Sequence, residues 1–339
     1  MASIDSNALT LGDHAQLSQN PIQKEIVKAI YETNNVVKDL PLSKSAAFKS
    51  NSPRLEGDGL PEVNWGRVNA APVTTKATFK QHEEAASIVR SRIRLDKRVL
   101  NQKDWITDPI KAQVMAWTEA WAYDATDKYF NNDPSAVDGN PDAWTGLKAR
   151  LDDPIKFGVV PELKIDAGGI NLKQNMTAAD ANNFMEVIDQ MLSYLGATDG
   201  NGCVFYCNDL VMRRWARAIR LLGAGAGFNT QKDNFDRMVE MYRNAKVRDC
   251  GRKRDQVSRV ISNTEAADGT DPGNGDRSSI YVVRYGEGRM AGWHDGDLEP
   301  EYTGKLDDGV THQWLVDYLI GLNPQHNRCF ARSYNLEVS

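Results

Sequence analysis

Cysteine is scarce in this chain of 339 residues, with only Cys203, Cys207, Cys250 and Cys329. They form no CxxC pair and lack the density of a disulfide framework, so we expect reduced thiols in a cytoplasmic setting. Histidine is also rare, with five copies. No Ser/His/Asp or Cys/His set is recognisable from spacing. The sequence therefore predicts no enzyme and no catalytic, cofactor-binding or metal-binding residues.

Long apolar runs are also missing. No stretch of about 18 apolar residues occurs, so the sequence predicts no membrane span. The first residues, MASIDSNALTLGDHAQ, have no basic region followed by an apolar core and do not predict a secretory signal. The net charge of -5 argues against bulk binding to nucleic acid or an anionic membrane. The remaining composition is that of a soluble globular protein, with length for about two domains.

A long helix over Asp108 to Asn132 is the strongest local pattern. Asp108 followed by Pro109 is a typical helix start. The opposite face carries Ala, Met and Tyr where a surface helix has Lys and Glu. Two interpretations stay open: a core helix of a two-layer domain, or a spine between a sheet and another segment or subunit. Its apolar stripe, at steps of three or four, includes Ile110, Val114, Trp117 and Trp121.

Two segments near the N-terminus have no core of their own. Residues 19–40 predict an amphipathic helix on an arm, followed by small polar residues at 43–61 that cannot fold alone. Residues 63–68 and 72–80 predict the two strands of a long hairpin. An isolated hairpin is marginal in water, so it must lie on a partner surface in this chain or a neighbouring one. The residues we expect at such an inter-subunit contact are Trp65, Arg67, Lys76, Phe79, Ile26 and Ile30.

The rest of the chain mixes helices with mostly antiparallel strands. Residues 177–195 and 210–222 predict amphipathic helices, the second carrying several arginines. Residues 286–304 are glycine-rich and predict turns. The mixture predicts an α+β fold. Strands are expected at 88–95, 157–165, 203–207, 279–284, 312–322 and 327–336.

Four stretches taken in order carry a resemblance to a known family. They are VNWGRVN with TFKQHEE; IRLDKRVL with the long helix ending in YFNNDP and then AWTGLKARL; SIYVVRYGEGRMAGWHDG; and WLVDYLIGLNPQHNRCFARSYNL. Their order and spacing resemble the major capsid protein of tailed double-stranded DNA bacteriophages, which has the Hong Kong 97-type fold. With the arm, the resemblance covers nearly the whole chain.

This resemblance implies a division of the chain into named parts. The expected parts are an N-terminal arm at 1–50, an extended-loop hairpin at 51–84, a peripheral domain at 85–171 with its spine helix at 108–132, an axial domain at 172–311, and closing strands at 312–339 that return to the peripheral domain.

The function implied by the resemblance is structural. Many copies would form hexamers and pentamers that close an icosahedral shell around phage double-stranded DNA. The protein would be assembled in the bacterial host cytoplasm, mature from a procapsid and reside in the virion. Implied partners are a separate scaffolding protein, a portal, non-specifically contacted DNA on the inner face and a decoration protein. Some capsids of this fold cross-link a hairpin Lys to an Asn; Lys76 and Lys80 are available, but without a matching Asn and Glu we predict no cross-link.

Two alternatives compete with the capsid interpretation. An encapsulin-like compartment shares the implied fold but would package enzymes. A nucleic-acid-binding protein would use the basic stretch 243–259, RNAKVRDCGRKRDQVSR. The simpler interpretation of that stretch is a solvated loop or a charge contact between subunits, because Asp249 and Asp255 interrupt it.

Overall fold

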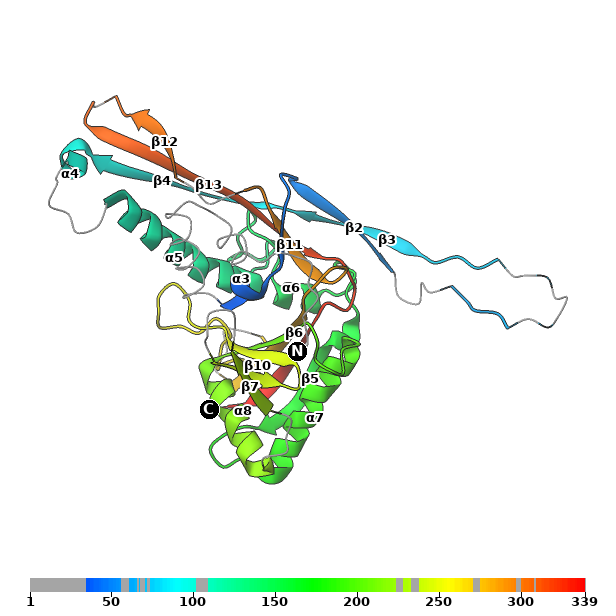
Figure 1. The fold of residues 1–339 in the computed structure, drawn as a ribbon. Coiled ribbons are helices and arrows are strands. Elements are labelled where there is room, and N and C mark those ends of the chain that lie inside the picture. Colours follow the sequence, from blue (N-terminus) through cyan, green and yellow to red (C-terminus); the bar gives the residue numbers. More distant parts are fainter. Residues whose placement is uncertain are drawn as a thin grey trace.

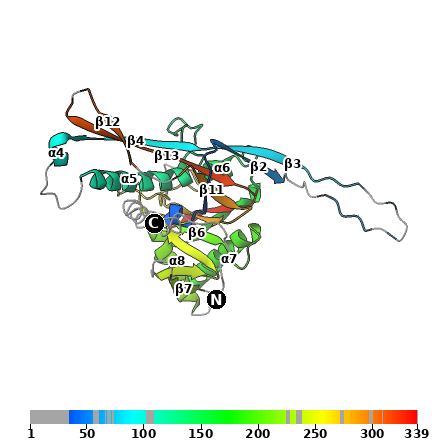
Figure 2. The same ribbon diagram turned by 45° about the horizontal axis from the view of Figure 1, so that its top comes forward.

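The computed structural model describes residues 35–55, 61–65, 67, 71, 74–101, 109–223, 228–232, 238–270, 275–296, 300–307 and 309–338. It contains an elongated upper sheet with a long helix beneath it, and a second, mixed body below that helix (Figure 1). A two-stranded hairpin extends from one end of the upper sheet, away from both bodies (Figures 1 and 2). The architecture is α+β, as predicted.

The upper sheet is organised around its longest strand, β13 (Thr311–Pro324). The whole length of strand β4 (Ser87–Asp96) pairs antiparallel with one edge of β13, from Thr311 to Ile320. The other edge of β13 pairs with β12 (Pro300–Lys305) and then with β11 (Met290–His294). Strand β1 (Leu42–Lys44) adds parallel to β11. These five strands form one sheet from three distant parts of the chain.

Helix α5 (Pro109–Asn131) lies along the underside of the upper sheet (Figure 2). Val114 and Trp121 are buried, and the Trp121 ring meets Tyr318 of β13 edge-on at a centroid distance of 5.7 Å. Ile110 and Trp117 are partly buried against the same core. Trp121 therefore contacts the upper sheet directly, and the packing role of the other three residues stays a prediction.

The second face of α5 differs between its two halves. Near its C-terminal end Phe130 is fully buried, with its ring 5.5 Å from Tyr206 and 5.1 Å from Tyr281 in the lower body. Ala112 and Ala116, near its N-terminal end, are exposed. Within the part of the chain that the structure describes, the C-terminal half of this face is thus covered, while the other half is exposed.

The end of the N-terminal arm packs on α5. Helix α3 (Asn35–Asp39) contacts α5, and Val36 and Val37 are buried. The Asp39 carboxylate accepts hydrogen bonds from Arg248 Nε and Lys246 Nζ, both at 3.1 Å, on a strand of the lower body. This segment therefore joins the two bodies. Ile26 and Ile30 lie outside the described residues.

The lower body is a seven-stranded sheet with two helices. Helix α7 (Ala178–Tyr194) begins at the predicted cap Thr177, which forms a capping box with Asp180. Helix α8 (Asp209–Leu222) begins after Asn208, packs against α7 and contacts β9. The strand order is β5 (Lys164–Asn171), β14 (Phe330–Glu337), β10 (Arg277–Arg284), β6 (Cys203–Cys207), β9 (Ala245–Asp249), β8 (Met238–Tyr242) and β7 (Phe228–Lys232).

Three short helical segments complete the described elements. Helix α4 (Lys97–Asn101) follows β4 at the far end of the upper sheet, and α6 (Leu147–Asp152) packs against α5. The 3-10 turn η1 (Pro161–Leu163) leads into β5.

The predicted strands of the hairpin are wrong in position. The paired strands are β2 (Lys49–Leu55) and β3 (Phe79–Ala85), joined antiparallel from Lys49↔Ala85 to Leu55↔Phe79. The described residues of 61–78 belong to no strand. The polar segment 43–61, predicted to be unable to fold alone, supplies β1 and β2. Its Ser, Lys and Asn residues become ordered because they pair with distant strands, which local composition does not report.

The predicted domain boundaries are also wrong for several strands. β11 and β12 lie in the upper sheet, although 172–311 was assigned to the axial domain and 286–304 to turns. Of the two closing strands, β13 joins the upper sheet but β14 lies inside the seven-stranded sheet. The strand expected at 157–165 begins instead at Lys164. Alternating apolar residues look alike in both sheets, so the sequence pattern does not say which sheet a strand joins.

Candidate assembly interface

The hairpin is a direct extension of the upper sheet. Strands β3 and β4 are separated only by Ala86, whose backbone N–H donates to the Phe48 carbonyl at 2.8 Å. β13 supports the β4 part and β2 supports the β3 part. One nearly continuous strand therefore carries the hairpin away from the sheet (Figure 2).

A buried group of charges, here called the root cluster, lies where the hairpin leaves the body. It consists of Arg54 of β2, Glu84 of β3 and Arg150 of α6. Arg150 donates two hydrogen bonds to Glu84, Nη1 to Oε1 at 2.5 Å and Nη2 to Oε2 at 2.7 Å. Arg54 Nη2 reaches Glu84 Oε1 at 3.2 Å, and its Nη1 donates to the Phe157 carbonyl. The cluster thus joins both hairpin strands to the body.

Burial controls the electrostatics of the root cluster. The side chains of Arg54 and Arg150 are each 1% exposed, and that of Glu84 is 13% exposed. Burial alone would raise the pKa of Glu84, but the Arg150 and Arg54 guanidinium groups together hold that pKa below its ordinary value. Burial lowers the pKa of Arg54. The carboxylate is needed because without it two guanidinium charges would face each other away from water.

Asn323 of β13 makes a second connection to the hairpin. Its side-chain amide donates to Ser50 Oγ at 2.8 Å, and its Oδ1 accepts from Ser52 Oγ at 2.5 Å. Nearby, Trp293 Nε1 donates to the Ala47 carbonyl at 2.7 Å. Strand β2 is therefore held to the upper sheet by Asn323 of β13, in addition to its attachment through the root cluster.

The outer part of the hairpin is exposed. Trp65 is 96% exposed, Val63 78% and Phe79 63%. Arg67 and Lys76 are exposed as well. An indole that is almost fully in water on such an extension needs a partner surface to gain the free energy of burial.

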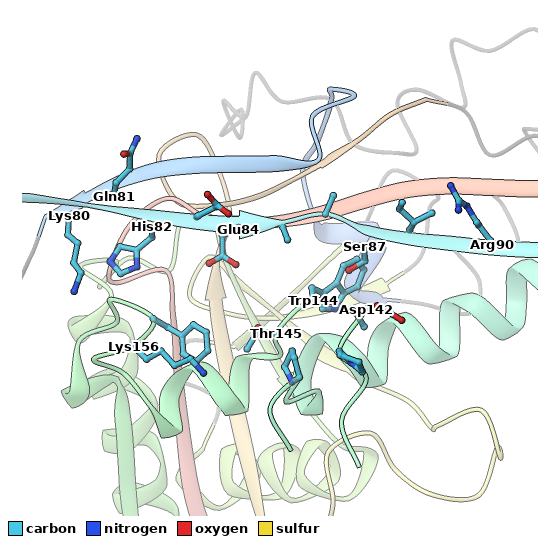
Figure 3. A pocket seen from close by; sticks show the side chains of 18 residues that line it. Lys80, Gln81, His82, Glu84, Ser87, Arg90, Asp142, Trp144, Thr145 and Lys156 are labelled. Carbon is cyan, nitrogen blue, oxygen red and sulfur yellow. The ribbon is translucent and has the colours of Figure 1, made fainter. Parts of the chain in front are cut away.

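A groove of about 820 Å³ runs along the root of the hairpin. One wall is the strand β3–β4, and the other carries Asp142, Trp144 and Thr145 (Figure 3). Lys80 and His82 point from the strand toward this second wall (Figure 3). The remaining lining residues are Gln81, Glu83, Glu84, Ala85, Ala86, Ser87, Ile88, Arg90, Pro134, Pro141, Ala143, Lys156 and Phe157.

The groove depends on a glycine and contains an unpaired strand edge. Gly158 has φ of +59°, and a Cβ built there would lie 2.2 Å from His82 Nε2, so a larger residue would displace the imidazole. Among the described strands, β4 pairs only with β13 on one edge. Its other edge offers backbone hydrogen-bonding groups to a further extended segment.

The structure brings together only some of the predicted contact residues. Trp65, Arg67, Lys76 and Phe79 lie on the exposed hairpin, as a segment that contacts a neighbour requires. The root cluster was not predicted, because Glu84 lies 30 residues from Arg54 and 66 from Arg150 and no periodicity connects them. The alternation of β3 could have shown that Glu84 shares the inward side of the strand with His82.

The basic stretch 243–259 is largely neutralised. Most of its cations form ion pairs with carboxylates from distant parts of the same chain, whereas the simpler interpretation expected a solvated loop or a charge contact between subunits. The pairs are Arg243–Asp189, Lys246–Asp39, Arg248–Asp39, Lys253–Asp127 and Arg259–Asp209. This stretch therefore does not form a continuous basic surface for nucleic acid.

The described residues contain no candidate metal site and no helix that could cross a membrane. No group of three or more His, Cys, Asp and Glu side chains is placed to hold a metal ion among them. Within the same residues, no helix has the length and apolar character needed to cross a membrane.

Comparisons with known proteins agree on one class. The family model of "Major capsid protein GP7" matches residues 18–177. Among solved structures, the holo-SrpI encapsulin complex from Synechococcus elongatus aligns with TM-score 0.60 and 12% identity, covering 88% of this chain and 86% of that one. The capsid of an empty GTA particle aligns with TM-score 0.56 and 12% identity, covering 89% of each chain. A chain from the structure of Microbacterium phage Oxtober96 aligns with TM-score 0.54 and 10% identity, covering 89% of this chain and 90% of that one.

A comparison with curated proteins gives no match. The structural alignments, at identities this low, establish the fold alone, and that fold is of the Hong Kong 97 type. The family match covers slightly less than half of the chain, over the arm, the hairpin and the long helix.

Proposed function

We propose that this chain is a major capsid protein that builds an icosahedral shell in the virion, and that it assembles as hexamers and pentamers in which the hairpin of each subunit lies in the groove of the next. The observation that carries the proposal is Trp65, 96% exposed at the outer part of a hairpin that has no core of its own. The groove beside β3–β4 offers Trp144 and Phe157 as apolar walls, and an open strand edge.

The geometry favours a ring of subunits. The hairpin leaves the body beside its own groove and points away from it, so its outer part is directed to a different copy (Figure 1). A contact between two different surfaces of identical chains is heterologous, and such contacts close into rings when the rotation allows. Hexamers and pentamers are rings of this kind.

The wider functional proposal follows from the capsid class. The shell would enclose double-stranded DNA, contacted non-specifically on its inner face, and would form with a scaffolding protein, a portal and a decoration protein. One structural neighbour is a satellite phage P4 procapsid that includes a size determination protein. A maturation step would change the angle of the hairpin at its root. We propose a purely structural role without catalysis or cofactor.

Electron microscopy of the expressed protein tests the shell. Closed shells or tubes are expected, and small monodisperse particles would contradict the proposal. Chemical analysis of shells made in the phage host separates the capsid from an encapsulin-like compartment, whose fold is shared. DNA with a portal supports the capsid, whereas an enzyme cargo without a portal supports the compartment.

Engineered cysteines test the groove. A chain with Trp65→Cys is mixed with a chain carrying Asp142→Cys, an exposed position on the groove wall. The four natural cysteines are buried and do not compete, and burial raises the pKa of the Cys207 thiol. Disulfide-linked dimers are expected from this mixture but not from Trp65→Cys with Val257→Cys, an exposed control on the lower body. Equal cross-linking in both mixtures would contradict the groove contact.

A further inference from the structure

Helix α8 carries a row of arginines on its outer side. Val211, Trp215 and Ala218 are buried and fix which face of the helix meets the lower body. Arg213, Arg217 and Arg220 follow one another at steps of four and three. Residues with this spacing lie along one face of a helix, so the three guanidinium groups form a row about 10 Å long.

The charge of this row is only partly neutralised. Asp209 is the one acidic residue of α8. It already binds Arg213, at 2.9 Å between Nη2 and Oδ2, and also binds Arg259. The Arg259 hydrogen bond holds the pKa of Asp209 below its ordinary value, so this carboxylate stays charged and engaged.

The two remaining arginines have no such partner. Within the described part of the chain, neither Arg217 nor Arg220 has a carboxylate within 4 Å; Arg220 Nε donates only to the Ala216 carbonyl of its own helix. Arg252, which is exposed, contributes to the lowered pKa of Asp209 and therefore lies in the neighbourhood of that carboxylate. The surface formed by Arg213, Arg217, Arg220 and Arg252, here called the α8 row, therefore carries net positive charge on a chain whose net charge is -5.

We infer that the α8 row binds the phosphate backbone of double-stranded DNA. Double-stranded DNA carries one phosphate per 3.4 Å or so of helix axis on each strand, so a row of about 10 Å is long enough for more than one guanidinium group to contact the phosphate backbone. Arginine presents two parallel N–H groups that fit a phosphate, and the contact needs no particular base sequence. Most of an acidic chain repels DNA, so contact with the genome requires a local cationic surface of this kind.

This inference rests on the proposed enclosure of DNA and assigns a surface to it. It differs from the earlier hypothesis for residues 243–259, where five cations are paired with carboxylates. The α8 row shares with that stretch only Arg252, at its edge.

A salt titration of DNA binding tests the α8 row. Full-length chain, purified as unassembled subunits or capsomers, is titrated with a short double-stranded DNA duplex at several salt concentrations. Each phosphate contact contributes about 0.9 to the slope of log affinity against log salt. The double variant Arg217→Gln/Arg220→Gln should therefore lose about two units of slope. Equivalently, raising salt from about 50 to about 200 mM should weaken its binding roughly tenfold less than that of the unaltered chain.

Arginines on the outer side of β4 supply the matched control. Arg92→Gln/Arg94→Gln removes the same charge from an exposed face of the upper sheet and should leave the slope unchanged. The inference is overturned if the unaltered chain does not bind the duplex, or if both double variants lose slope equally. It is also overturned if the α8 variant stops forming capsomers while its DNA binding persists, because the row would then contact a second copy.

Microscopy of the same samples separates this inference from the proposed function. If the α8 variant forms shells with an unchanged slope, the row does not bind DNA and the shell proposal stands. If the unaltered chain forms no shells, the shell proposal fails whatever the slope.

Discussion

Replacing Glu84 by Gln should destabilise the subunit far more than the same change at its neighbour Glu83. Glu84 accepts two hydrogen bonds from Arg150 and one from Arg54, and both arginine side chains are 1% exposed. Glutamine keeps the shape but removes the charge, which leaves two guanidinium groups buried together. Breaking a buried ion pair from one side costs about 3–5 kcal/mol.

Glu83 is a matched control one residue away. It pairs with Lys49 through side chains that are 54% and 63% exposed. Exposed pairs contribute about 0–1 kcal/mol because water and salt screen them, so Glu83→Gln should be nearly neutral. Both variants make the same charge change in the same strand, and the two sites differ in burial and in the cations that they pair with.

Urea unfolding of unassembled subunits is the appropriate assay, because urea is uncharged and does not screen the ion pair. Free energies of unfolding are compared for the unaltered chain, Glu84→Gln and Glu83→Gln at neutral pH. Equal losses in the two variants would refute the assignment of the root cluster as the main attachment of the hairpin.

The same comparison has a predicted pH dependence. The folded-state pKa of Glu84 lies below the ordinary value of 4.5, so the folded chain binds its proton less readily than the unfolded chain. The stabilisation by Glu84 is therefore complete above about pH 4.5 and is lost as the pH falls through the folded-state pKa. Glu84→Gln and the unaltered chain should converge in stability in acid, and a gap that widens there would contradict the sign.

Three further changes follow from the packing. Trp121→Asp places a charge at a position 6% exposed and should abolish soluble subunit, while the exposed Glu119→Asp on the same helix should not, as measured by soluble yield. Asn323→Ala removes both hydrogen bonds to β2 and should cost about 1–3 kcal/mol, with faster hydrogen exchange in β2 and not in α7; unchanged exchange in β2 would contradict it. Mature particles should show no covalent ladder on a denaturing gel; a ladder lost on changing Lys76 or Lys80 to Arg would overturn the prediction.

Several elements were predictable because their signals are local. Pro109, Thr177 and Asn208 mark where helices α5, α7 and α8 begin. The periodicity of apolar residues predicts which face of each helix is buried. The exposure of Trp65 on a hairpin without a core was also predictable, and its contact with a neighbouring subunit stays a prediction. The position of its strands was not, because β2 is a polar segment that becomes a strand only by pairing with β3.

The sequence by itself determined the helices, the exposed hairpin and, through the order of four segments, the resemblance to the Hong Kong 97-type fold that the structural alignments confirm. Only the tertiary structure decided which sheet each C-terminal strand joins, which carboxylate neutralises each cation of 243–259, and how Glu84 meets Arg54 and Arg150. The physical reason is the separation in sequence over which each interaction acts. Periodicity and capping act within a few residues, whereas ion pairs and strand pairings join residues far apart in sequence, and their partners are set by how the whole chain packs.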